Sequence, residues 1–124
     1  MKFNNYNDYL TYSKKIYDIH MARSVLNWDM ETKMPKNGNK FRAQQLSTLA
    51  KISYELATDD KYGILLEKLI NDKSLSDDQR RNVFLSNKEF KKNLKYSSDF
   101  ITRQSKIISK AFQDWRIAKD KNDF

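Results

Sequence analysis

Side chains that commonly carry chemistry are scarce in this 124-residue chain, which has one histidine, His20, and no cysteine. Catalytic zinc sites built without cysteine use two or three histidines, so His20 alone cannot form one. The missing cysteines also exclude a thiol nucleophile and a disulfide framework. The spacing of its neighbours places His20 on the inner stripe of an amphipathic helix, which predicts a hydrogen-bonded packing histidine rather than a ligand or a base.

Two pairs of adjacent carboxylates, Asp59-Asp60 and Asp77-Asp78, are the next possible source of chemistry. Neighbouring residues on a helix point about 100° apart, so neither pair can address one substrate atom as an acid and a base. Acidic residues stabilise the first turn of a helix through the helix dipole, and we interpret both pairs in that way. The two isolated glycines, Gly38 and Gly63, exclude a glycine-rich phosphate loop.

The most distinctive polar cluster begins at a tryptophan and surrounds the only proline of the chain. A buried indole could anchor a turn there, while a carboxylate or hydroxyl caps free backbone N–H groups. An arginine and a glutamine three residues apart share a helix face and could bond to the same turn. On these residues alone, turn architecture is favoured over catalysis. The cluster comprises Trp28, Asp29, Thr32, Met34, Pro35, Gly38, Arg42 and Gln45.

Helices must position these side chains, because two glycines and one proline leave little of the turn chemistry that sheets need. Apolar residues recur at steps of three and four, and Ser76 with Gln79 forms a capping box. We predict an all-α fold in a single domain, residues 1–124, arranged as an antiparallel bundle or as hairpins. Its five helices run over about 5–27, 39–57, 59–70, 77–95 and 98–119, and the chain reverses at residues 34–39.

The net charge of +8 raises nucleic acid as a partner. Nine Lys and Arg residues against two acidic residues lie between Arg80 and Lys110. On a helical wheel, however, much of this charge lies opposite Val83, Phe90 and Leu94, which indicates a solvated stripe behind a buried face. Exposed aromatic residues between the charges, typical of nucleic-acid binders, are missing. Nucleic acid is therefore disfavoured, and a stand-alone basic helical module that binds nucleic acid or a protein remains the alternative.

The order of residues from Trp28 to Leu49, W-D-x-E-T-x-M-P-x-x-G-x-x-x-R-x-x-Q-L-x-x-L, resembles the N-terminal part of the carboxypeptidase Taq family of metal-dependent carboxypeptidases. The likeness continues through Glu55-Leu56, Thr58-Asp59 and the Gly63 segment. It returns at Trp115, Ala118 and the residues from Lys119 to Phe124. Two positions depart from the pattern: Lys36 stands where a second proline is common, and Tyr54 where a histidine is common.

This resemblance implies an all-helical parent, several times longer, that removes single residues from the C-termini of peptides. In that family a helix bearing H-E-x-x-H holds a divalent metal, usually zinc, a later glutamate is the third ligand, and the motif glutamate is the general base. None of these elements occurs in this chain. The resemblance therefore implies an N-terminal fragment that is inactive alone, binds no metal itself, and covers the substrate groove of the parent.

Further expectations concern partners and location. The remainder of the parent chain would pack against this segment, the peptide would lie in the groove, and a homodimer is also allowed. Apolar residues on the first or fifth helix should then be exposed in the isolated chain. No apolar run is long enough for a membrane span and the N-terminus has no signal core, which predicts a cytoplasmic protein without membrane contact.

Overall fold

The computed structural model describes residues 4–123, which form five α-helices and one 3-10 turn and contain no strand. The predicted all-α class is confirmed. Met1–Phe3 and Phe124, including the last residue of the family-like terminal segment, lie outside the described residues. The helices are α1 (Tyr6–Thr32), η1 (Lys36–Gly38), α2 (Asn39–Ala57), α3 (Asp60–Ile70), α4 (Asp77–Asn93) and α5 (Ser98–Asp120).

Local side-chain chemistry sets where four of the helices begin. Asn5 accepts from the amide of Asp8 and closes a capping box at the start of α1, and Ser76 does the same with Gln79 at α4. Asp59 caps α3, and the Ser97 hydroxyl accepts from the Phe100 amide at α5. These caps confirm the predicted starts of the last three helices. Asp60, Asp77 and Asp78 lie in first turns as predicted, whereas Asp59 is the N-cap itself.

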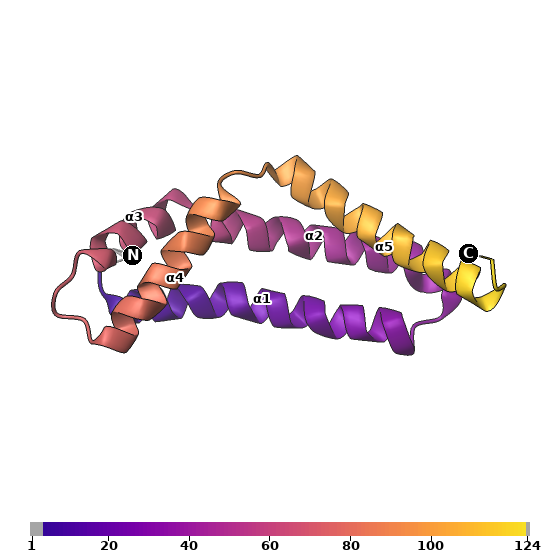
Figure 1. Cartoon of the computed structure of the whole chain (residues 1–124), viewed down its shortest axis with the longest axis horizontal. Helices are drawn as coiled ribbons and strands as arrows, with labels where there is room; N and C mark the ends of the chain where they lie inside the picture. Colours follow the sequence, from indigo (N-terminus) through magenta and orange to yellow (C-terminus); the bar gives the residue numbers. More distant parts are fainter. Residues whose placement is uncertain (1–3, 124) are drawn as a thin grey trace.

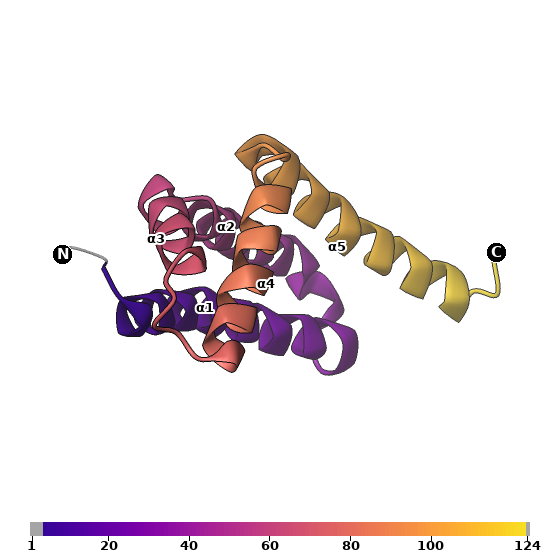
Figure 2. The same cartoon turned by 60° about the vertical axis from the view of Figure 1, so that its left-hand side comes forward.

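Helices α1 and α2 form an antiparallel hairpin, and α5 runs along the other side of α2 (Figure 1). Helix α4 crosses obliquely and packs chiefly on α3, at the end of the molecule where α1 begins (Figures 1 and 2). Helix α2 is thus shared by the hairpin and by α5. The turn between α1 and α2 lies at the opposite end, beside the last turns of α5.

The main hydrophobic core lies where α1, α3 and α4 meet. The rings of Tyr12 and Tyr62 stack with centroids 4.7 Å apart, and the phenol of Tyr12 donates to the Leu56 carbonyl. Burial raises the pKa of Tyr12 to about 12, with smaller contributions from Asp59 and Tyr62, and burial also raises the pKa of Tyr62. The buried core residues are Tyr9, Tyr12, Tyr62, Leu65, Leu66, Leu69, Leu75 and Val83.

Small residues hold α5 against α2. Ser47 and Ala50 on α2 and Ser109 on α5 are each 2% exposed. The Ser109 hydroxyl donates to the Ser105 carbonyl within its own helix, so its burial leaves no unpaired donor. Close packing through small side chains explains why these two helices make the most extensive contact in the fold. Because small residues occupy the contact with α2, the larger apolar residues of α5 lie on its other faces.

The structure corrects two of the predicted burials. His20 is exposed and does not pack in the interior, because it lies one turn beyond Ile16, where this face of α1 borders an open hollow rather than the core. Leu94, expected on the buried face with Val83, is 53% exposed, because α4 ends at Asn93 and Leu94 is its C-cap.

The expected exposure of apolar residues on α1 and α5 is confirmed. Tyr17 and Trp28 on α1 are 60% and 59% exposed, and Ile108 and Trp115 on α5 are 59% and 51% exposed. Within the described residues, no helix combines the length and the hydropathy required for a membrane crossing.

Candidate functional site

The turn between α1 and α2 carries the cluster that the sequence singled out. Helix α1 does not end near Asn27 as predicted but continues to Thr32. The carbonyl of Asp29 accepts from the amides of both Lys33 and Met34, at 2.9 and 2.8 Å. Pro35 restricts only the residue before it, so the helix persists almost to that point. Trp28, Asp29 and Thr32 are therefore helical residues, and the turn itself is shorter than expected.

Arg42, in the second turn of α2, joins the two helices. Its Nη2 donates to Asp29 Oδ2 at 2.8 Å, and its Nη1 donates to the Leu26 carbonyl at 2.7 Å. Its Nε donates to Gln45 Oε1 at 3.1 Å, which orients the guanidinium from within α2. The Arg42 side chain is only 14% exposed, so solvent weakens this ion pair less than those on the open surface. Arg42 and Gln45 therefore both stabilise the contact between the end of α1 and the start of α2.

The expected burial of the Trp28 ring and capping by Thr32 are both wrong. Trp28 is 59% exposed, and the Thr32 hydroxyl donates to the Trp28 carbonyl one turn earlier. Because α1 includes both residues and ends at Thr32, this hydroxyl binds the preceding turn and caps no helix N-terminus. Asp29 likewise pairs with Arg42 and caps no helix.

Gly38 has a φ of −76°, a conformation open to any residue, so the turn does not require its flexibility. A Cβ at this position would lie 3.1 Å from Cγ of Met34, a flexible side chain that can move aside. The amide of Gly38 donates to the Pro35 carbonyl at 2.9 Å and closes the 3-10 turn. Met34, Pro35 and Gly38 thus form one compact reversal.

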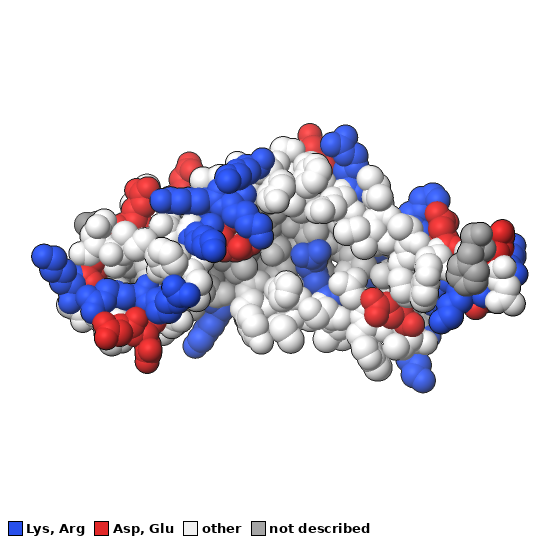
Figure 3. Space-filling model, viewed as in Figure 1, with Lys and Arg blue, Asp and Glu red and all other residues white. Residues whose placement is uncertain are grey.

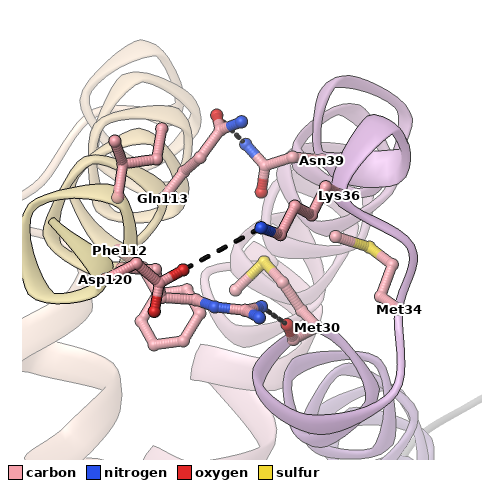
Figure 4. A pocket seen from close by; sticks show the side chains of 9 residues that line it. Met30, Met34, Lys36, Asn39, Phe112, Gln113 and Asp120 are labelled. Carbon is pink, nitrogen blue, oxygen red and sulfur yellow. Dashed lines mark hydrogen bonds and ion pairs between the residues drawn. The ribbon is translucent and has the colours of Figure 1, made fainter.

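A small pocket of about 90 Å³ lies between this turn and α5 (Figure 4). Met30 and Met34 approach it from the α1 side and Phe112 from α5, which gives it an apolar floor. Asn39 Nδ2 donates to Gln113 Oε1 at 2.7 Å across its rim. Lys36 Nζ lies 3.9 Å from Asp120 at another edge.

Sequence reasoning missed the contribution of α5 to this site. Arg116 Nη1 donates to the Met30 carbonyl at 3.3 Å, and Gln113 binds Asn39. The two residues of each pair are more than 70 positions apart, so no local sequence spacing predicts these hydrogen bonds. The periodicity of α5 was the only available signal. It indicated that Phe112 is on an apolar face but not that this face meets the turn between α1 and α2.

The polar side chains of this site bind one another and hold the turn together. Across residues 4–123, no three His, Asp or Glu side chains converge as metal ligands. The donor set of these residues therefore does not fit a catalytic metal ion. Asp29 is engaged by Arg42, and the remaining polar groups of the cluster are amides and hydroxyls.

Comparison with known proteins matches residues 8–124 to carboxypeptidase Taq (M32) metallopeptidase. Carboxypeptidase 1 of Bacillus subtilis (strain 168) is 31% identical, over 92% of this chain and 24% of its own length. Thermostable carboxypeptidase 1 of Pyrococcus furiosus is 32% identical, over 90% of this chain and 22% of its own length.

A solved structure described as "The Structure of CHT" superposes with a TM-score of 0.74 at 36% identity, covering 95% of this chain and 24% of that one. The chain thus spans about a quarter of the length of the relatives it matches. The continuous match over nearly all of the chain agrees with the turn and helix order described above. The chain therefore belongs to the carboxypeptidase Taq (M32) metallopeptidase family.

Proposed function

We propose that this chain is the N-terminal helical part of a metallocarboxypeptidase that removes C-terminal residues from peptides. Its part in that reaction is architectural: it covers the substrate groove, while residues outside it hold the metal, expected to be zinc. The observation that carries the proposal is the family match over residues 8–124 in a chain that spans about a quarter of its relatives.

The surface of the isolated chain supports this reading. Leu10, Tyr17, Met21 and Trp28 follow one another at steps of seven, four and seven residues, so they lie on one face of α1, and each is at least 38% exposed. Ile108 and Trp115 make a similar exposed pair on α5. Aligned apolar stripes of this kind are typical of surfaces that pack against further protein.

The middle of the face formed by α1, α2 and α5 is also largely uncharged, whereas charged side chains gather toward the two ends of the molecule (Figure 3). We expect the remainder of the longer protein to cover this face. The turn residues from Trp28 to Gln45 would then hold the edge of the groove, line it, or do both.

The alternative is a stand-alone basic module. It is favoured by the cluster of Lys and Arg side chains over α4 (Figure 3). It is also favoured by the rings of Phe84, Tyr96 and Phe100, which are 48%, 40% and 38% exposed and correct the expectation that exposed aromatic residues are missing between these charges. Three of the cations between Arg80 and Lys110 already pair with acidic neighbours: Arg80 with Asp77, Lys92 with Glu89, and Lys110 with Asp114. Binding of this kind weakens steeply with salt. Fluorescence anisotropy with labelled single- and double-stranded oligonucleotides in 50 and 200 mM salt tests it, and we expect no salt-sensitive binding.

The proposed division of labour is tested by assaying the purified chain on an N-blocked dipeptide, with zinc or cobalt added. We expect no release of the C-terminal amino acid above the rate of the buffer with the same metal. Release that depends on the metal and disappears with a chelator would mean that the chain itself holds a metal centre, which would overturn the proposal.

A further inference from the structure

A second hollow, remote from the turn, lies between α1, α2, α3 and α4 and has a volume of about 490 Å³. Its wall carries the hydroxyls of Ser13, Tyr62 and Ser86 beside the apolar side chains of Ile16 and Phe90. The hydroxyls of Ser13 and Tyr62 lie 3.3 Å apart. The architectural role proposed above uses Tyr17 at the edge of this hollow but gives no part to its polar groups.

Arg23 lines the hollow and is the least satisfied cation of the fold. Its guanidinium is half-buried, and its Nε is out of contact with solvent and has no acceptor among the described residues. Burial lowers the pKa of Arg23, but an arginine remains protonated in proteins. The other partly buried arginines have hydrogen-bond acceptors: Arg42 donates to three groups and Arg116 donates to the Met30 carbonyl.

The neighbouring charges do not neutralise Arg23. Glu89 lines the same hollow, but its carboxylate lies 3.4 Å from Lys92 Nζ on its own helix. His20, one turn before Arg23, also lines the hollow and carries no negative charge. The Nε of Arg23 is buried without an acceptor among the described residues, so an anion placed beside it would satisfy this donor.

The shape and chemistry of the hollow select the kind of anion. A guanidinium presents a planar fork of donors that matches the two oxygens of a carboxylate. A single guanidinium balances the one negative charge of a carboxylate, whereas a phosphate dianion would need further cationic donors. Ile16 and Phe90 provide an apolar surface for the carbon chain that carries the carboxylate.

We propose that the hollow between α1 and α4 is a carboxylate-binding site in which Arg23 supplies the counter-charge. The carboxylate comes from an acidic side chain of a segment packed over the hollow or from the free C-terminus of a peptide. This inference concerns the chain itself and stands apart from the architectural role, since its test measures binding and stability and no peptidase activity.

Two five-residue peptides distinguish the sources in NMR titrations of the ¹⁵N-labelled chain. One carries an internal glutamate between leucines and has both ends blocked; the other has no acidic side chain and a free C-terminus. Each has a neutral counterpart, with glutamine or with a C-terminal amide. We expect one of the two carboxylates to bind at least tenfold more tightly than its counterpart and to shift the Arg23 Nε–H resonance.

The variant Arg23→Gln should lose this preference, whereas Arg103→Gln, which removes an exposed cation from α5, should keep it. Binding only of the internal glutamate identifies a side-chain site, and binding only of the free terminus identifies a peptide-terminus site. Equal binding of both carboxylates and their neutral counterparts, or equal binding by the two variants, would overturn the proposal.

Stability gives a second readout. Because Arg23 is half-buried without a partner, Arg23→Met should raise the urea midpoint of the isolated chain, as expected for a residue kept for binding. Arg42→Met should lower the midpoint, since Arg42 has three partners. A fall in the midpoint for Arg23→Met comparable to that for Arg42→Met would show that Arg23 serves the fold of the isolated chain and would contradict the proposal.

Discussion

Arg42 donates to Asp29 at 2.8 Å and thereby fixes the second turn of α2 against the last turns of α1. The same guanidinium donates to the carbonyl of Leu26, so it binds both a side chain and the backbone of α1. This one side chain sets how the hairpin closes around the short reversal at Pro35. The reversal in turn supports one wall of the methionine-lined pocket against α5.

Truncating this side chain should be costly. Arg42→Ala removes three hydrogen bonds and leaves the Asp29 carboxylate without its ion pair, so we expect a loss of about 2 to 3 kcal/mol in the free energy of unfolding. Arg80→Ala is the matched control, because Arg80 pairs with Asp77 on an exposed helix face and should cost less than about 1 kcal/mol. Urea unfolding followed by circular dichroism measures both, and equal losses would contradict the role given to Arg42.

The two glycines should respond differently to alanine. A Cβ on Gly63 would lie 2.5 Å from Cζ of Phe90, a ring that also packs edge-on against Tyr62. Gly63→Ala must therefore displace packed aromatic side chains, at a cost of about 1 to 3 kcal/mol. Gly38→Ala meets only the flexible side chain of Met34, and we expect a change within about 0.5 kcal/mol. Thermal unfolding of the two variants checks the order, which would be reversed if backbone flexibility at Gly38 were required.

Stability should decline in alkaline solution through the buried tyrosines. The ordinary pKa of a tyrosine is 10.0, and burial raises that of Tyr12 to about 12. Unfolded chains release this proton above about pH 10 while the native state retains it, so the contribution is complete below pH 10 and is lost between pH 10 and 12.

Urea midpoints measured at pH 9, 10.5 and 11.5 test this dependence. Tyr12→Phe should flatten the alkaline decline, although it loses the hydrogen bond to Leu56 and starts from a lower stability. Tyr17→Phe, at a position 60% exposed, should leave the pH profile unchanged. Identical slopes for the two variants would mean that Tyr12 does not titrate as described.

The exposed apolar stripes predict self-association of the isolated chain. The double variant Ile108→Ser with Trp115→Ser removes two large apolar side chains from one face of α5 without touching the buried Ser109 contact. Sedimentation velocity should show a lower weight-average mass for this variant than for the unmodified chain at the same concentration. The control Lys106→Ser changes an exposed polar position on the same helix. An unmodified chain that stays monomeric at high concentration would contradict this prediction.

The sequence predicted a feature correctly where the interaction that determines it joins residues close together in the chain. Ser76 with Gln79, and Ser97, could be identified as caps because their partners lie three residues away. The end of α1 was misplaced because the proline effect acts on one residue only. The exposure of Trp28 and His20 follows from which side of α1 meets α2, α3 and α4, and periodicity alone does not specify that.

The candidate site also combines local interactions, which the sequence predicted, with long-range contacts, which it did not. Arg42 and Gln45 were found from their spacing on one helix, and their partner Asp29 lies in the same short segment. Gln113 and Arg116 reach the turn only because Ser109 and Ala50 let α5 lie close along α2. Such packing depends on residues that are small and have no chemical signature of their own.

The central claim, that this chain supplies the groove-covering part of a metallocarboxypeptidase, is tested most directly by a graft. Residues 8–124 replace the matching segment of carboxypeptidase 1 of Bacillus subtilis, and hydrolysis of an N-blocked dipeptide is measured beside the parent and a variant that lacks the segment. We predict that the deletion abolishes activity and that the graft restores it. A deletion variant as active as the parent, or a folded and metal-loaded graft no more active than the deletion, would contradict the account.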